Sequence, residues 1–237
     1  MADATKYQVI INMDQNTADS LSQQNFTLYA FKAVEGPANG KPVVWWAMDD
    51  LGLRNTLQWE EFYHVFTTRT AQFDANTRVR VDNDYSASLG DILTVDSPTG
   101  TGTVTGNGPT GAISVLNNTS NQFSCGLSQA QDDGGFTPMA VFPLYGHNED
   151  EMVPVARVFL MFASKTLNTG TVIEKSFSSG MFIDLTGAPT EDGRLTRTVT
   201  YELNKSWDDN SATWGTVVAP NTDLVPLLIQ GKRPGAA

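Results

Sequence analysis

The sequence predicts an all-β fold, a single-domain antiparallel β-sandwich with a long loop or hairpin rich in Gly and Thr. Short segments that alternate apolar and polar residues recur along the 237 residues, as strands with one buried and one solvated face do. Gly, Asn, Asp and Pro separate these segments, and turns such as 168–170 and 191–193 favour hairpins. Charged residues make up only 17% of the chain, which suits a loop-rich β protein.

The expected strands follow one another at short intervals. Residues 195–203, LTRTVTYEL, show the clearest alternation, with Leu195, Arg197 and Val199 on one face and threonines on the other. Together with the segment discussed next, the pattern predicts about ten to fourteen strands. The other expected strands are 7–12, 25–33, 42–48, 77–81, 91–95, 112–116, 139–144, 155–163, 171–178, 180–185 and 212–218.

Residues 56–70, TLQWEEFYHVFTTRT, fit two secondary structures. As a helix starting after Asn55, the segment would place Trp59, Phe62, Tyr63 and Phe66 on one face. As a strand, it would place Leu57, Trp59, Tyr63 and Val65 on one side and Phe62, His64 and Phe66 on the other. The wealth of aromatic and β-branched residues favours the strand, with the first set in the core.

Two segments are expected to be mobile. Residues 97–111, SPTGTGTVTGNGPTG, have Val104 as their only apolar side chain beyond proline, which indicates a flexible loop or hairpin. The tail, 232–237, and the head of the chain resemble free termini. No repeat or long linker divides the chain, so residues 1–237 are predicted to form one domain.

The charge of the chain limits its partners. Fifteen basic and 26 acidic residues give a net charge of −11, so we expect no nucleic-acid partner and no attraction to anionic membranes. The longest apolar run, 152–163, is interrupted by Arg157 and is too short to be a transmembrane segment. No classical signal peptide is evident, which predicts a soluble protein, either cytoplasmic or exported by a leaderless route.

The residues of acid–base catalysis are sparse, and we therefore expect no enzyme. Only two histidines, His64 and His147, could activate a nucleophile. The single cysteine, Cys125, reads as a small buried hydrophobe, although pairing with either histidine stays open. Glu60 and Glu61 are adjacent, so on a strand they point to opposite faces and cannot form a glycosidase pair. A hydrolase built from carboxylates that are distant in sequence remains an alternative.

No cofactor is expected, and the identity of any metal is unknown. Residues 82–91 offer Asp82, Asp84, Ser86, Ser88 and Asp91, but they lack the Gly and Glu of an EF-hand loop. A weak calcium site and solvated turns are both compatible with this segment.

Tryptophans supply the candidate ligand-binding residues. Trp45 and Trp46 are consecutive, so on a strand only Trp46 is expected to be free. Trp207 and Trp214 flank the acidic turn with Asp208 and Asp209, which predicts a carbohydrate platform. The alternative is that both rings cover the end of the sandwich.

Several segments resemble one known family. NFTLYAFKA, VVWWAM and TLQWEEFYHVFTT, followed by TGTVIEKSFSSGMFIDLTG and RTVTYELNKSWD, are similar to the rhizosphere-expressed Rhi A family of root-nodule bacteria and to related small bacterial and fungal β proteins. This resemblance covers about half of the chain and includes no catalytic motif. It implies an abundant protein of host or surface interaction and assigns no residue a role.

The sequence thus predicts a non-catalytic protein that works through its surface. It would act by self-association, as a homo-oligomer, or by binding a glycan or other cell-surface partner. Two alternatives are a β-pore-forming toxin that uses residues 97–111 and the hydrolase with dispersed carboxylates.

Overall fold

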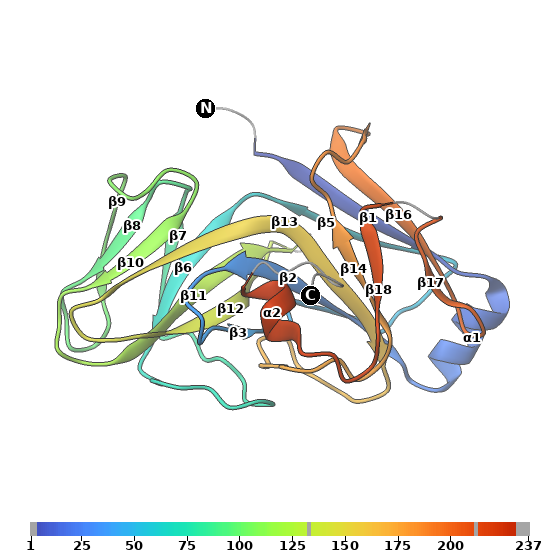
Figure 1. The fold of residues 1–237 in the computed structure, drawn as a ribbon, viewed down its shortest axis with the longest axis horizontal. Coiled ribbons are helices and arrows are strands. Elements are labelled where there is room, and N and C mark those ends of the chain that lie inside the picture. The colour runs from blue at the N-terminus through green and yellow to red at the C-terminus, as the bar shows by residue number, and fades with distance from the viewer. Residues whose placement is uncertain (1–3, 132–133, 211–212, 231–237) are drawn as a thin grey trace.

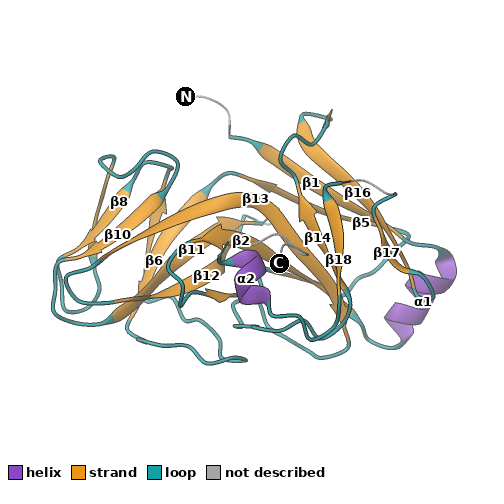
Figure 2. Cartoon of the chain, viewed as in Figure 1, coloured by secondary structure: helices purple, strands orange, loops and turns teal. Residues whose placement is uncertain are grey.

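The computed structural model describes residues 4–131, 134–210 and 213–230, and it confirms the all-β, sandwich-like prediction (Figures 1 and 2). The described residues form eighteen strands and two short helices. The helices are α1 (Gln15–Gln23) and α2 (Leu224–Leu228). The strands are β1 (Lys6–Asn12), β2 (Thr27–Glu35), β3 (Lys41–Pro42), β4 (Trp46–Met48), β5 (Arg54–Glu60), β6 (Tyr63–Thr68), β7 (Asn83–Ala87), β8 (Ile92–Val95), β9 (Gly102–Thr105), β10 (Ile113–Asn117), β11 (Phe123–Ala130), β12 (Phe136–Leu144), β13 (Glu149–Ala163), β14 (Gly180–Asp184), β15 (Thr190–Glu191), β16 (Arg194–Glu202), β17 (Ser206–Asp208) and β18 (Gly215–Val218).

The strands form three sheets. The first sheet has the order β15-β16-β1-β5, with β17 on β16. The long sheet runs β18-β14-β13-β10-β8-β9, with β2 on β13 and β4 on β2. The third sheet has the order β3-β12-β11-β6-β7. Pairing is mostly antiparallel, but β1 lies parallel to β16 and β8 parallel to β10.

Strand β13 is the longest strand, and Figure 1 shows it arching from the end that holds β8–β10 to the region of β14 and β18. Its first residues pair with β10, and its later residues pair with β14 and β2. Val158, Leu160 and Phe162 face the main core, while Phe159 and Met161 face a second apolar cluster. Both faces are covered, which explains why this segment reads as a continuous apolar run.

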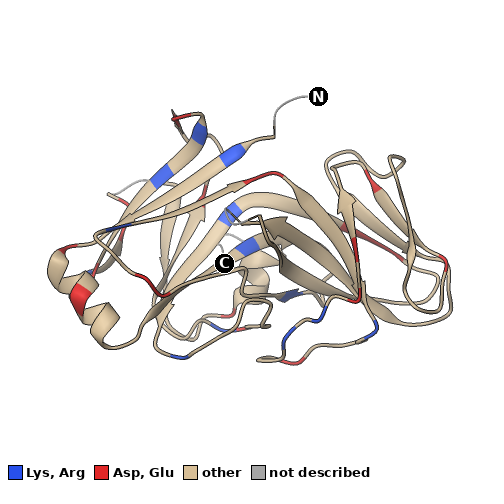
Figure 3. Cartoon of the chain, turned by 180° about the vertical axis from the view of Figure 1, so that it is seen from behind, with Lys and Arg blue, Asp and Glu red and all other residues tan. Residues whose placement is uncertain are grey.

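One core joins the three sheets. Ile11 of the first sheet, Leu160 of the long sheet and Leu127 of the third are fully buried in the same cluster. Acidic side chains lie along the chain at both ends of the molecule, including helix α1 (Figure 3). Among the described residues, Lys32 and Asp150 are the only charged side chains that are buried, so the core is largely apolar.

Residues 56–70 are extended, as predicted, but they form two strands and not one: β5 belongs to the first sheet and β6 to the third, and a break at Glu61 and Phe62 separates them. Leu57, Trp59, Tyr63 and Val65 all lie in the main core. On the other side Phe62 is 54% exposed, but Phe66 is buried with Val141 and Val172. A separate small cluster thus covers the outer face of the third sheet.

Helix α1 was not expected from the sequence. Asp14 caps it by accepting the Thr17 N–H at 2.6 Å, and Leu21 anchors its buried side. The strands expected at 77–81 and 171–178 are wrong, because these segments form no named strand and contribute only isolated bridges, such as that of Arg78 with Thr171. Within the described part of the chain, no helix is long and apolar enough to cross a membrane.

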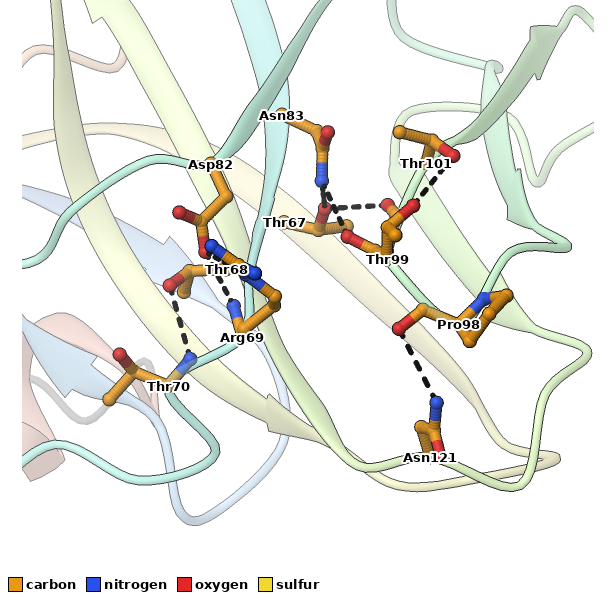
Figure 4. Close-up of polar contacts among 11 residues, drawn as sticks. Thr67, Thr68, Arg69, Thr70, Asp82, Asn83, Pro98, Thr99, Thr101 and Asn121 are labelled. Atoms are coloured by element: carbon orange, nitrogen blue, oxygen red, sulfur yellow. Dashed lines mark hydrogen bonds and ion pairs between the residues drawn. The ribbon is translucent and has the colours of Figure 1, made fainter.

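The Gly/Thr-rich segment forms a hairpin, since β9 pairs with β8 along its length. Figure 4 shows how its first turn is attached: Thr67 Oγ1 donates to Gly100 O at 2.7 Å, and Asn83 Nδ2 donates to Thr99 O at 3.2 Å. Val104 packs against the main core. The tail predicted to be mobile, 232–237, lies outside the described residues.

Candidate functional site

The structure separates the two tryptophans of the predicted carbohydrate platform. Trp207 is only 4% exposed, and its ring stacks on Phe162 with centroids 5.2 Å apart. Its Nε1–H donates to Ser179 O at 3.1 Å, so its polar atom is satisfied inside the protein. Trp207 therefore belongs to the core, and the prediction that it binds a ligand at the surface is wrong.

Trp214, in contrast, lines a groove of about 540 Å³ between the long sheet and the first sheet. β14 contributes Asp184, β16 contributes Arg197, and the start of β18 contributes Thr216. The full lining is Phe182, Asp184, Thr186, Arg197, Thr213, Trp214 and Thr216. The lining therefore offers one indole ring, three threonine hydroxyl groups, one positively charged side chain and one negatively charged side chain.

Arg197 fixes the position of the indole. Its guanidinium carbon lies 4.8 Å from the centroid of the Trp214 ring, a cation–π geometry. Its Nε donates to Asp184 O at 3.3 Å and its Nη2 to Thr186 O at 3.2 Å. These bonds connect β16 to the end of β14, so the wall of the groove is pre-formed.

Asp184 is an ionised acceptor. Burial raises the pKa of this carboxyl, but hydrogen bonds from Thr186 and the ion pair with Arg157 outweigh burial and hold the pKa below its usual range. The Thr186 N–H donates at 2.8 Å and Arg157 Nε at 3.3 Å. A carboxylate held in this state suits hydrogen bonding to a ligand and does not suit proton donation.

The other predicted ligand residues lie apart from this groove. Trp46 is half-buried on β4, edge-on to the buried Trp45, and does not line the groove. Asp208 is exposed and accepts the Asn210 N–H at 2.8 Å, and Asp209 packs so closely on Gly215 that no side chain would fit there. Of the five predicted ligand residues, only Trp214 lines the groove.

The groups considered for nucleophilic catalysis are also separated. Cys125 is fully buried, 4.0 Å from Asp150 Oδ2, on the core side of the third sheet. His64 lies on the opposite face of that sheet, where its Nδ1 contacts Asp84 Oδ2 at 2.6 Å and Phe136 stacks on its ring. This arrangement leaves Cys125 and His64 unable to act as a pair.

The carboxylates of the predicted weak calcium site serve other partners. Asp82 accepts the Arg69 N–H at 2.8 Å, Asp84 contacts His64, and Asp91 accepts the Ser88 N–H at 2.7 Å. No group of three or more metal-ligating side chains occurs among the residues described.

A second hollow, of about 410 Å³, adjoins this segment and is lined by two arginines. Arg69 and Arg80 line it together with Thr68, Thr70 and Asp82. Asp82 holds the Arg69 backbone and lies 3.6 Å from Arg69 Nε. Because the carboxylate offsets one of the two cations, the hollow is a poor anion site.

Known proteins provide no assignment for the Trp214 groove. No family model, curated protein or solved structure matches this chain. The sequence pattern did not identify three residues of the groove, Asp184, Thr186 and Arg197. One signal was present, because Arg197 is a charged residue on the apolar side of the alternation at 195–203.

Proposed function

We propose that the protein is a non-catalytic binding protein whose groove at Trp214 takes a saccharide unit of a glycan or other cell-surface partner. The observation that carries this proposal is the Trp214 groove with its fixed indole and surrounding hydroxyl and charged groups. Amphipathic aromatic rings contact the apolar faces of sugars, and a few well-placed polar groups then fix orientation.

The carboxylates favour binding over hydrolysis. A glycosidase needs one carboxyl that stays protonated near the scissile bond. Asp184 in the groove has a lowered pKa, and the carboxyl with a raised pKa, Asp150, is 4% exposed inside the core. The hydrolase with dispersed carboxylates is therefore a weaker proposal than binding. The β-pore-forming toxin is weaker too, because its hairpin carries Gly and Thr at the positions where lipid-facing residues would be apolar.

Self-association is the second candidate, and strand β18 favours it. β18 is an end strand of the long sheet, and its sequence, GTVV, has no charge or proline to protect the edge. Val217 on this strand is 50% exposed. Light scattering across a range of protein concentrations tests this candidate; a constant mass of 25.7 kDa would argue against it.

The saccharide proposal is tested by a glycan array followed by calorimetric titration of the best oligosaccharide. We expect Trp214→Ala to weaken binding at least tenfold, or about 1.4 kcal/mol. Trp46→Ala is the matched control, since Trp46 is also half-buried and lies outside the groove. Equal loss in both variants, or no oligosaccharide binding to the unmodified protein, would contradict the proposal.

A further inference from the structure

Lys32 occupies a core position on β2. The alternation of this strand sends Leu28, Ala30 and Val34 into the main core and Tyr29 and Phe31 into the second cluster. Lys32 is in phase with the first set and is only 3% exposed. Lysines are almost never buried to this degree unless they have a partner, so its surroundings need an explanation.

Three aromatic rings surround the Lys32 amine. Its Nζ lies 4.1 Å from the centroid of Trp59, 5.4 Å from that of Trp45 and 5.8 Å from that of Tyr7. Tyr7 stacks on Trp59 at 5.5 Å, and Trp45 meets Trp59 edge-on at 5.4 Å. Tyr7 belongs to β1 and Trp59 to β5, so the amine joins the first sheet to β2.

The cluster contains one acidic side chain. Glu61 accepts a hydrogen bond from Tyr7 Oη at 2.6 Å, and Tyr63 of β6 is an ionisable neighbour of both Glu61 and Tyr7. On β13, Val158 lies opposite Lys32, and the adjacent Arg157 pairs instead with Glu35 and Asp184. Burial lowers the pKa of Lys32 to about 7, against the smaller opposing effect of Glu61. Its charge therefore changes near neutrality.

The packing around the amine is also imperfect. Trp59 Nε1, which is buried, has no hydrogen-bond partner within the residues that the structure describes. The pairing of β2 with β13 is interrupted by a bulge next to Lys32. An unpaired buried N–H and a bulge both lower the cost of local opening at this junction.

We propose that Lys32 and the rings of Tyr7, Trp45 and Trp59 form a proton-sensitive contact that controls how firmly the first sheet packs on β2. A neutral amine suits the aromatic surroundings, whereas a charged amine is held there only by the rings and by Glu61, and it is better solvated when β1 and β5 move away. Between about pH 7 and 10 the packed state binds fewer protons than the opened state. Raising the pH therefore favours packing, and the equilibrium constant between the packed and the opened state rises by up to tenfold per pH unit.

This contact also bears on the Trp214 groove. Val9 of β1 is in register with Arg197 of β16, so the sheet held by Lys32 also carries one wall of the groove. Regulation of ligand binding by pH would rest on the proposed function, whereas the proton-sensitive contact itself does not. The test below uses no ligand, so its failure is distinguishable from failure of the saccharide proposal.

The test is an NMR titration of protein labelled with ¹³C at the lysine Cε, between pH 5 and 11. We expect one lysine signal that is shifted upfield by the rings and titrates near pH 7. Lys32→Met should remove that signal, and Lys6→Met, on the exposed part of neighbouring β1, should leave it in place.

Amide exchange provides the second readout. In the unmodified protein, protection of β1 and β5, after correction for intrinsic exchange, should rise by up to tenfold per unit between pH 7.5 and 9.5, and protection of β11 and β12 should not. In Lys32→Met the rise should disappear. A Lys32 signal that titrates near pH 10, or a rise that persists without Lys32, would overturn the proposal.

Discussion

Two buried ionisable side chains show how one core treats opposite charges. Lys32 lies among three aromatic rings, and burial lowers the pKa of its amine to about 7. Asp150 lies beside Cys125 and accepts a hydrogen bond from Asn148 Nδ2 at 3.0 Å, and burial raises the pKa of its carboxyl to about 6. Aromatic faces attract a cation but not an anion, so Asp150 depends on an amide donor instead.

Both groups cost stability near neutral pH, but they respond to pH in opposite directions. Both lie on strands of the long sheet but in different parts of the core: Lys32 is on β2 and faces Tyr7 and Trp59 of the first sheet, whereas Asp150 is on β13 and faces Cys125 of the third sheet. A buried charge is thus tolerated where aromatic faces attract it, as at Lys32, or where an amide donates a hydrogen bond to it, as at Asp150. Substitutions in both clusters test this contrast.

The largest effect is expected from removing the ring nearest to Lys32. Trp59→Ala should lower the free energy of unfolding by roughly 3–5 kcal/mol, because it creates a cavity and removes the ring that lies nearest to the Lys32 amine. Urea unfolding at pH 7 measures this change. Phe62→Ala is the control, since Phe62 is 54% exposed and should cost little. Similar losses in the two variants would show that Trp59 is not part of a packed cluster.

Replacing the lysine should have the opposite sign. Lys32→Met keeps the apolar stem and removes the buried amine, so we expect the free energy of unfolding at pH 7 to rise by roughly 2–4 kcal/mol, after allowing for the lost cation–π contacts. Chemical denaturation at pH 7 and pH 10 checks both the gain and its decrease at high pH. A loss of stability at pH 7 would mean that the rings stabilise the charged amine more than burial destabilises it.

Asp150→Asn should produce a smaller gain. The amide cannot ionise, so its burial avoids the cost that raises the pKa of Asp150, and we expect a gain of roughly 1–2 kcal/mol at pH 7. The gain should vanish at pH 4, where the native carboxyl is protonated. Thermal unfolding at the two pH values is sufficient, and an equal gain at both would point to packing rather than charge.

The two groups together predict the shape of the stability profile. The folded state binds more protons than the unfolded state at Asp150 between about pH 4 and 6, so stability falls as the pH rises there. It binds fewer at Lys32 between about pH 7 and 10, so stability rises there. These two groups therefore contribute a minimum near pH 6–7. Each single variant should flatten one limb of the profile and leave the other unchanged.

The smallest effect is expected at the half-buried cation–π pair of Arg197 and Trp214. Arg197→Gln loses the contact with Trp214 and the bonds to the ends of β14, at a cost of roughly 0.5–1 kcal/mol. Near-ultraviolet circular dichroism should show greater freedom of the indole, while the fold persists. A cost as large as that of Trp59→Ala would contradict the contrast between the fully buried Lys32 cluster and the half-buried pair of Arg197 and Trp214.

Local pattern was sufficient for much of the fold. The alternation at 56–70 placed Leu57, Trp59, Tyr63 and Val65 in the core, because the two-residue period of a strand assigns each side chain to a face without reference to distant residues. The Gly/Thr-rich composition of 97–111 left a loop or a hairpin open, and the structure has a hairpin in which β9 pairs with the preceding β8. Where alternation was present without a partner strand, at 77–81, the same rule failed, since a strand also needs an edge to pair with.

The sequence by itself thus determined the all-β class, the net charge of −11 and the buried side of the aromatic segment. Only the tertiary structure decided that Trp207 is buried while Trp214 lines a groove, and that Lys32 meets rings from β1, β5 and the segment before β4. The physical reason is that burial, cation–π contacts and pKa values depend on side chains far apart in the chain, which the packing of three sheets brings within a few ångströms.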